Sequence, residues 1–182
     1  GEPETEAPLE TTVKETPPSP QAEHANVNTS RLLEADREPG QWMSHGRTYS
    51  EQRFSPLTEI NRETVGELSL AWHQDLDTNR GQEATPLVID GVMYLTTAWS
   101  KGKAYDAATG EELWAYDPQV PGEWAVHACC DVVNRGLAAW NGKLYLGTLD
   151  GRLVALDAET GEEVWSKFTI DRSKPYTITG AP

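Results

Sequence analysis

The residues with the clearest chemical potential in this sequence are its two cysteines, Cys129 and Cys130, which are adjacent and are followed by Arg135. Adjacent trans residues place their Cα atoms about 3.8 Å apart, whereas ordinary disulfides span about 4.4–6.8 Å. A bond between the two sulfurs would therefore close a tight eight-membered ring and bend the peptide inside it. Strain of that kind usually persists only where a site uses it. The pair alone leaves two alternatives open: two reduced core cysteines, or one ordinary thiol beside another.

Composition and charge narrow the classes of function. The chain has 182 residues and a formal net charge of −14, which argues against binding to nucleic-acid phosphates. No apolar run approaches the roughly 20 residues that span a bilayer, so we do not expect a transmembrane protein. The two cysteines form neither a CxxC metal motif nor a CxxCH haem motif. An oxidised pair would need an oxidising compartment, which in a bacterium is the periplasm.

The amino-terminal part of the sequence carries weak structural signals. Residues 1–29 are rich in Glu, Pro, Thr and Ser, which predicts a disordered tail or linker. A short helix is expected around Ser30, ending at Pro39-Gly40. The alternation of large and small residues from Leu68 to Leu76 predicts a half-buried strand. The chain begins without Met and stops abruptly, so we expect a piece of a longer protein that lacks its leader.

An internal repeat gives the fold class. The segment Ala104–Trp114 returns as Ala155–Trp165 at an offset of 51 residues, and both copies share the pattern Ala-x-Asp-x-x-Thr-Gly-Glu-Glu-x-Trp. A period near 50 residues with four short strands per unit is typical of β-propeller blades. In the second unit we expect four strands and a two-residue turn at Asn141-Gly142; the strands are 137–140, 143–148, 152–157 and 163–168.

The tryptophan that ends each repeat has a structural interpretation. Trp114 and Trp165 each offer a large flat surface with one N–H donor, and we expect each to dock one blade against the next. Two blades are visible, whereas a closed ring needs several more. The sequence therefore predicts an all-β, incomplete propeller over residues 30–182, preceded by the tail of residues 1–29. Such a piece is not expected to be stable or active alone, because its sheet edges are exposed.

The repeats, together with Cys129-Cys130-Asp131-Val132-Val133-Asn134-Arg135-Gly136, resemble the alcohol dehydrogenases that depend on pyrroloquinoline quinone (PQQ). The lead-in agrees with this family over Trp42–Arg47, Arg53–Leu57, Leu70–Trp72 and Gln82–Pro86. The resemblance implies an eight-bladed propeller that holds the quinone near its axis, between a tryptophan and a vicinal disulfide. It also implies oxidation of an alcohol, with an electron acceptor such as a cytochrome c.

The resemblance assigns five cofactor-binding residues. Cys129 and Cys130 would form the disulfide that stacks on the quinone, and Arg135 would reach the quinone oxygens and stabilise charge there. Glu83 matches an acidic cofactor contact, and Thr179 matches a threonine that contacts the cofactor carboxylates. A solvated loop carboxylate is the alternative for Glu83, and an ion pair with Asp131 is the alternative for Arg135.

Several roles are left without a residue in this sequence. The resemblance places the calcium ligands and the catalytic aspartate after Pro182, so no catalytic or metal residue is assigned, and a haem c domain would need a CxxCH motif further on. His127 is interpreted as a loop histidine, Trp124 as either a substrate-entrance residue or a buried loop aromatic, and Asp131 as a partner of Arg135 or of backbone amides. The competing function is a non-catalytic propeller that scaffolds other proteins. That function leaves Cys129-Cys130, Arg135 and Glu83 unexplained.

Overall fold

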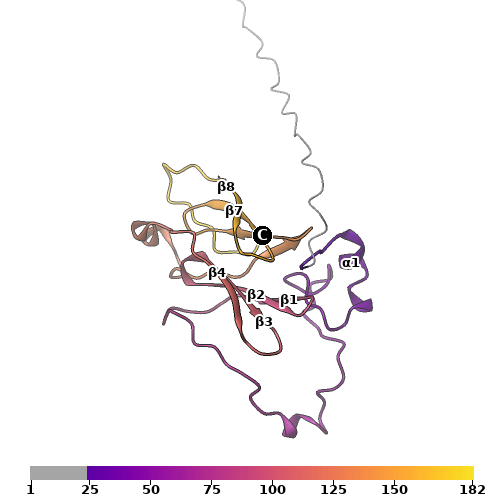
Figure 1. Cartoon of the computed structure of the whole chain (residues 1–182). Helices are drawn as coiled ribbons and strands as arrows, with labels where there is room; N and C mark the ends of the chain where they lie inside the picture. The colour runs from indigo at the N-terminus through magenta and orange to yellow at the C-terminus, as the bar shows by residue number, and fades with distance from the viewer. Residues whose placement is uncertain (1–23) are drawn as a thin grey trace, which may run out of the picture.

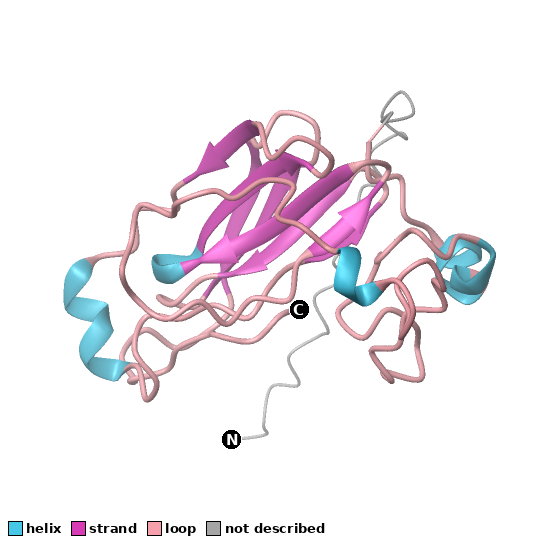
Figure 2. Cartoon of the chain, turned by 90° about the horizontal axis from the view of Figure 1, so that it is seen from below, coloured by secondary structure: helices cyan, strands magenta, loops and turns pink. Residues whose placement is uncertain are grey.

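The computed structural model describes residues 24–182, whose strands form two four-stranded antiparallel sheets (Figure 1). Each sheet is a simple meander in which every strand pairs with the next along the chain. The strands gather at the centre of the molecule and the loops surround them (Figure 2). The first sheet contains β1 (Leu87–Ile89), β2 (Val92–Thr97), β3 (Lys101–Asp106) and β4 (Glu112–Tyr116). The second contains β5 (Ala138–Trp140), β6 (Lys143–Gly147), β7 (Arg152–Asp157) and β8 (Glu163–Phe168).

The two sheets are the two predicted blades, which confirms the all-β, partial-propeller fold. Strands β7 and β8 have the predicted bounds, whereas β5 and β6 are each one residue shorter than predicted. Asn141 and Gly142 join β5 to β6 with φ angles of 47° and 71°, as the expected hairpin turn requires. In the turn between β7 and β8, the carboxylate of Asp157 accepts the backbone N–H of Thr160 at 3.0 Å.

Tryptophan docking joins the blades as the repeat predicts. Trp114, at the end of the first blade, donates its indole N–H to the carbonyl oxygen of Ala158 in the second, at 3.1 Å. Its ring lies flat on Gly161, where an added Cβ would stand 2.6 Å from the indole. Trp72 covers Gly110 of the first blade in the same way, with a corresponding distance of 2.5 Å. The absence of a side chain at each glycine therefore permits the close approach.

The blades also share one hydrophobic core. Trp114 is 9% exposed and packs in a cluster with buried residues of both sheets, including Leu87, Ile89, Leu144 and Leu156. Trp165, the equivalent residue of the second blade, is 39% exposed and contacts Tyr145 of its own sheet, with ring centroids 6.1 Å apart. Its docking onto a further blade stays a prediction.

Residues 24–29 correct part of the predicted tail. Ala25 and Val27 are fully buried, and their carbonyl oxygens accept the backbone N–H groups of Gly142 and Asn141 at 3.1 and 2.8 Å. These residues therefore pack against the second blade and are not a disordered tail. The remainder of that prediction, residues 1–23, lies outside the described part of the chain.

The expected helix near Ser30 is confirmed as α1 (Thr29–Leu33), followed by the single turn η1 (Ala35–Arg37). Asn28 caps α1 by accepting the N–H of Arg31 at 3.0 Å. Three further 3₁₀ turns are η2 (Val65–Glu67), η3 (Ala98–Ser100) and η4 (Gly122–His127). None of the helices in residues 24–182 is long and apolar enough to cross a membrane.

The strand predicted from Leu68 to Leu76 is wrong: this segment carries no strand, and it forms part of a long arc outside the sheets (Figure 1). Leu68 and Leu70 are 59% and 77% exposed. A strand needs a neighbour to accept and donate its backbone hydrogen bonds, and none of the described strands pairs with this segment. The alternation alone therefore indicated a geometry that only a partner strand can stabilise.

Candidate functional site

The two cysteines are bonded to each other, which confirms the predicted vicinal disulfide. Their Cα atoms are 3.8 Å apart, the separation of any adjacent trans pair. Both residues are exposed and follow η4 after Ala128, so the ring is presented at the surface of the described structure. Asp131 then turns the chain with a φ of 60°, a left-handed conformation that an aspartate tolerates better than most residues.

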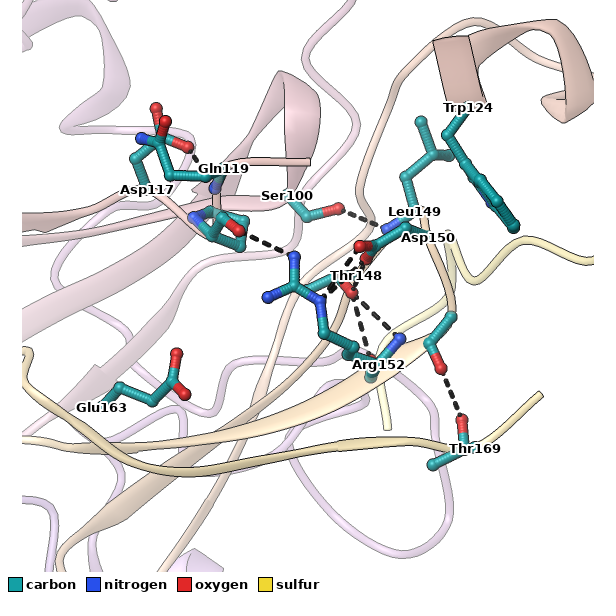
Figure 3. A network of polar contacts seen from close by, with 12 residues as sticks. Ser100, Asp117, Gln119, Trp124, Thr148, Leu149, Asp150, Arg152, Glu163 and Thr169 are labelled. Atoms are coloured by element: carbon teal, nitrogen blue, oxygen red, sulfur yellow. Dashed lines mark hydrogen bonds and ion pairs between the residues drawn. The ribbon is translucent and has the colours of Figure 1, made fainter. Parts of the chain in front are cut away.

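A buried ion pair anchors the start of the loop that carries the disulfide (Figure 3). Arg152 donates from Nη2 to the carbonyl oxygen of Pro118 at 2.7 Å, and its Nε lies 3.0 Å from the carboxylate of Asp150. The side chain of Asp150 is only 4% exposed, and it also accepts the hydroxyl of Thr148 at 2.5 Å. Buried charges are stable only when paired and hydrogen-bonded in this way. The second blade therefore fixes the position where the loop leaves β4.

Two further contacts hold the middle and the end of the same loop. Trp124 is buried and donates its indole N–H to the carbonyl oxygen of Tyr176 at 3.2 Å. Of the two alternatives for Trp124, the structure supports the buried loop aromatic. His127 lies edge-on against the ring of Trp124, with centroids 5.2 Å apart, as a loop histidine. The backbone N–H of Trp99, a residue with a φ of 65°, donates to Val132 at 2.8 Å.

The other three predicted site residues meet in one cluster. Arg135 forms an ion pair with Glu83 at 2.8 Å and donates from Nη1 to the hydroxyl of Thr179 at 2.7 Å. Its backbone is held as well, because its N–H donates to the carbonyl of Thr179 at 2.9 Å and its carbonyl accepts the N–H of Thr85 at 3.2 Å. The side chains of Arg135 and Glu83 remain 37% and 43% exposed. The guanidinium is therefore fixed in place but can still reach a ligand.

The ion pair with Asp131, which was the alternative interpretation of Arg135, does not form. Asp131 accepts instead from Arg80, at 2.8 Å, while Arg135 pairs with Glu83. Arg80 lies three residues before Glu83, and nothing in its sequence context had indicated this role. Gly81 also lies against Val133, where an added Cβ would be 3.5 Å from the valine side chain. The disulfide loop and the Glu83 loop therefore pack side by side.

Sequence reasoning missed a second arginine near the cluster. Arg53 donates to the hydroxyl of Thr85 at 2.6 Å and lies 3.1 Å from the imidazole Nε2 of His45. Arg53 begins the segment Arg53–Leu57, whose similarity to the family was the signal that could have pointed to it. Within the described residues, no group of three or more His, Cys, Asp or Glu side chains is placed to hold a metal ion.

The geometry can be compared with known proteins. The family model described as "Glucose/ethanol/alcohol dehydrogenase, beta-propeller domain" matches residues 42–171. The chain belongs to the PQQ-dependent alcohol dehydrogenase family. The matched residues include both blades, the vicinal disulfide, Glu83 and Arg135.

Relatives within this family are similar over most of the chain. The chain is 64% identical over 157 residues to the dehydrogenase subunit of an alcohol dehydrogenase (quinone) from Komagataeibacter europaeus, which covers 83% of this chain and 21% of that protein. It is 55% identical over 144 residues to a 1-butanol dehydrogenase (cytochrome c) from Thauera butanivorans, covering 79% and 21%. The solved structure of the quinohemoprotein alcohol dehydrogenase ADHIIG from Pseudomonas putida HK5 superposes with a TM-score of 0.86 at 56% identity, covering 87% and 23%. The chain spans about a fifth of the length of these relatives.

Proposed function

We propose that this chain forms the first cofactor-facing blades of a periplasmic quinoprotein alcohol dehydrogenase, which oxidises an alcohol by hydride transfer to PQQ with the assistance of Ca²⁺. One observation carries the proposal. An exposed vicinal disulfide lies in a loop packed against the loop of Glu83, and Glu83 pairs with Arg135 at 2.8 Å. A scaffolding propeller would need the tryptophan-docked blades but neither of these features.

The residues present suit a planar, anionic quinone. The disulfide ring is stiff and exposed, so it can serve as a flat wall for an aromatic disc. Arg135 carries five N–H donors in a rigid fork, which matches a carboxylate or a pair of quinone oxygens. Thr179 already accepts one N–H of Arg135 at 2.7 Å, so its own hydroxyl proton is free to donate to a carboxylate. Cys129, Cys130, Arg135, Thr179 and Glu83 are thus the proposed cofactor-binding residues.

When bound, the quinone would supply the hydride acceptor and calcium the Lewis acid that polarises its carbonyl. The residues of this chain would do the positioning. Cys129 and Cys130 would exclude water from one face, and Arg135 would stabilise the negative charge that develops at the quinone oxygens. Glu83 and Thr179 hold the guanidinium from two sides, so little reorganisation is needed during the reaction. The proposal assigns the calcium ligands and the base that removes the hydroxyl proton to residues outside 1–182.

The electron acceptor and the location belong to the same proposal. The names of the relatives include both a quinone and a cytochrome c as acceptor. The proposed acceptor is a cytochrome c, reached either directly or through a haem c domain of the same protein. The oxidising periplasm suits the bonded Cys129–Cys130 pair.

The test is reconstitution of the full-length gene product with Ca²⁺ and PQQ, followed by a panel of alcohols with an artificial dye as acceptor. The wild type should turn over at least one primary alcohol. Arg135→Ala should lower kcat by about 10²–10³-fold when it is measured at saturating PQQ, since one preorganised donor to a developing anion has about that effect. Arg37→Ala is the matched control, because the Arg37 side chain is 77% exposed and its one ion pair within residues 24–182 is with Glu34, three residues earlier.

Two outcomes would contradict the proposal. Equal kcat values for wild type and Arg135→Ala would remove Arg135 from the site. A folded wild type that neither binds PQQ nor oxidises any alcohol would favour the scaffolding propeller.

A further inference from the structure

The side chain of Asn134 spans the two residues that follow it in the chain. Its Oδ1 accepts the backbone N–H of Gly136 at 3.1 Å, a turn in which Arg135 is the central residue. Its Nδ2 donates to the carbonyl oxygen of Gly147, the last residue of β6, at 2.8 Å. Asn134 is 1% exposed, so water does not compete for either bond.

These two bonds tie the turn around Arg135 to the rigid part of the second blade. The bond to Gly147 fixes where the turn lies, and the bond from Gly136 fixes the backbone angles of the residue between them. Gly147 also contacts Ile178, the neighbour of Thr179, where an added Cβ would lie 2.5 Å from the isoleucine. The element that holds Asn134 therefore also supports the segment that accepts the guanidinium of Arg135.

We propose that Asn134 is a positioning residue for PQQ binding, because it sets the direction in which Arg135 projects toward the cofactor. This inference rests on the proposed function. Both polar atoms of the Asn134 side chain bind the backbone of Gly136 and Gly147, so in this proposal its effect on the cofactor passes through Arg135. An alanine at this position would leave the carbonyl of Gly147 and the N–H of Gly136 without these partners, and the turn would lose both constraints.

A double-mutant cycle on the full-length protein tests the idea, with PQQ affinity as the readout in equilibrium dialysis. Asn134→Ala should weaken PQQ binding about tenfold and Arg135→Ala about a hundredfold. The double variant should bind no more weakly than Arg135→Ala, within about twofold, because Asn134 has no other route to the ligand. Losses that multiply to about a thousandfold would overturn the proposal. If the alanine variant does not fold, Asn134→Ser replaces it in the cycle, because serine keeps a short acceptor but cannot reach Gly147.

Asn28→Ala is the matched control for a loss of stability alone. Asn28 also binds the backbone through its side chain, accepting from Arg31 at 3.0 Å at the start of α1, so its removal should cost about 1 kcal/mol of stability. The Asn28→Ala substitution should leave PQQ affinity unchanged. If Asn28→Ala weakened PQQ binding as much as Asn134→Ala, the effect of Asn134 would be a general loss of stability and the proposal would be wrong.

A second readout needs no cofactor. Phenylglyoxal modifies accessible arginines, and peptide mass spectrometry reports the rate at each site. Asn134→Ala should speed modification of Arg135 several-fold relative to Arg37 in the same sample, because the guanidinium leaves Glu83 and Thr179. An unchanged ratio would overturn the positioning role even if PQQ affinity fell. A wild type without PQQ affinity would refute the proposed function instead, while this ratio still decides whether Asn134 orients Arg135.

Discussion

Substitution of Gly161 by alanine tests the docking of one blade on the next. Gly161 has a φ of 73°, and an added Cβ would lie 2.6 Å from the indole of Trp114. Two costs therefore combine in Gly161→Ala: the left-handed backbone, and the clash with a ring that cannot move without losing its hydrogen bond to Ala158. Gly91 offers a matched control, since its φ is 84° but an added Cβ would meet nothing within 4 Å.

The two costs can be separated by magnitude. A left-handed conformation costs an L-residue about 1–2 kcal/mol, and this term should be the whole effect of Gly91→Ala. Overpacking against a well-packed side chain adds about 1–3 kcal/mol, so Gly161→Ala should destabilise by about 2–5 kcal/mol. The difference between the two variants is the cost of the clash between the added methyl group and the Trp114 ring.

The assay is the denaturant midpoint of the full-length protein, followed by tryptophan fluorescence, for wild type and both variants. Gly161→Ala in a Trp114→Phe background should lose part of its excess cost, because the smaller ring leaves room for the methyl group. Equal destabilisation by Gly91→Ala and Gly161→Ala would refute the docking role of Trp114.

Two further predictions concern ion pairs. The hydrogen bond from Lys101, at 3.1 Å, lowers the pKa of Asp77 below its ordinary value of 3.8. The stability that this pair contributes is thus present above pH 3.8 and is lost as the pH falls through the lower folded-state pKa. Asp77→Asn should therefore destabilise the protein at pH 7. The difference in melting temperature between this variant and wild type should vanish in strong acid. The side chains of Arg80 and Asp131, which form the second pair, are 51% and 39% exposed. A double-mutant cycle should therefore give a coupling free energy of unfolding of about 0.2–1 kcal/mol that declines as salt is added. A coupling free energy that does not change with salt would contradict the assignment of an exposed ion pair.

The repeat made the blades predictable because each strand of a blade has its partner nearby in the chain. Strands 152–157 and 163–168 were predicted with their observed bounds, and Trp114 docks as expected. The segment from Leu68 to Leu76 has the same alternation but pairs with no strand of the described structure. Local pattern therefore predicted strands only where pairing is local.

Contacts between distant segments that the repeat does not relate were not predictable from the sequence. Resemblance named Glu83, Arg135 and Thr179, but only the structure shows that Arg135 binds the other two directly. Asp131 was interpreted as a partner of Arg135 or of backbone amides, whereas its side chain pairs with Arg80, 51 positions earlier. Ala25 lies in a segment whose Glu and Pro content predicts disorder. It is buried because it packs against a turn more than 100 residues later, which its own sequence context does not indicate.

The most direct test of the proposed site is PQQ binding to the full-length protein with and without the Cys129–Cys130 ring. Alkylation without reductant should first show by mass spectrometry that neither cysteine of the wild type is labelled. Replacement of both cysteines by alanine should then weaken PQQ binding at least about tenfold in equilibrium dialysis, while the denaturant midpoint changes little, since both residues are exposed. Two labelled thiols in the wild type, or equal PQQ affinity in the two proteins, would contradict the role assigned to the disulfide.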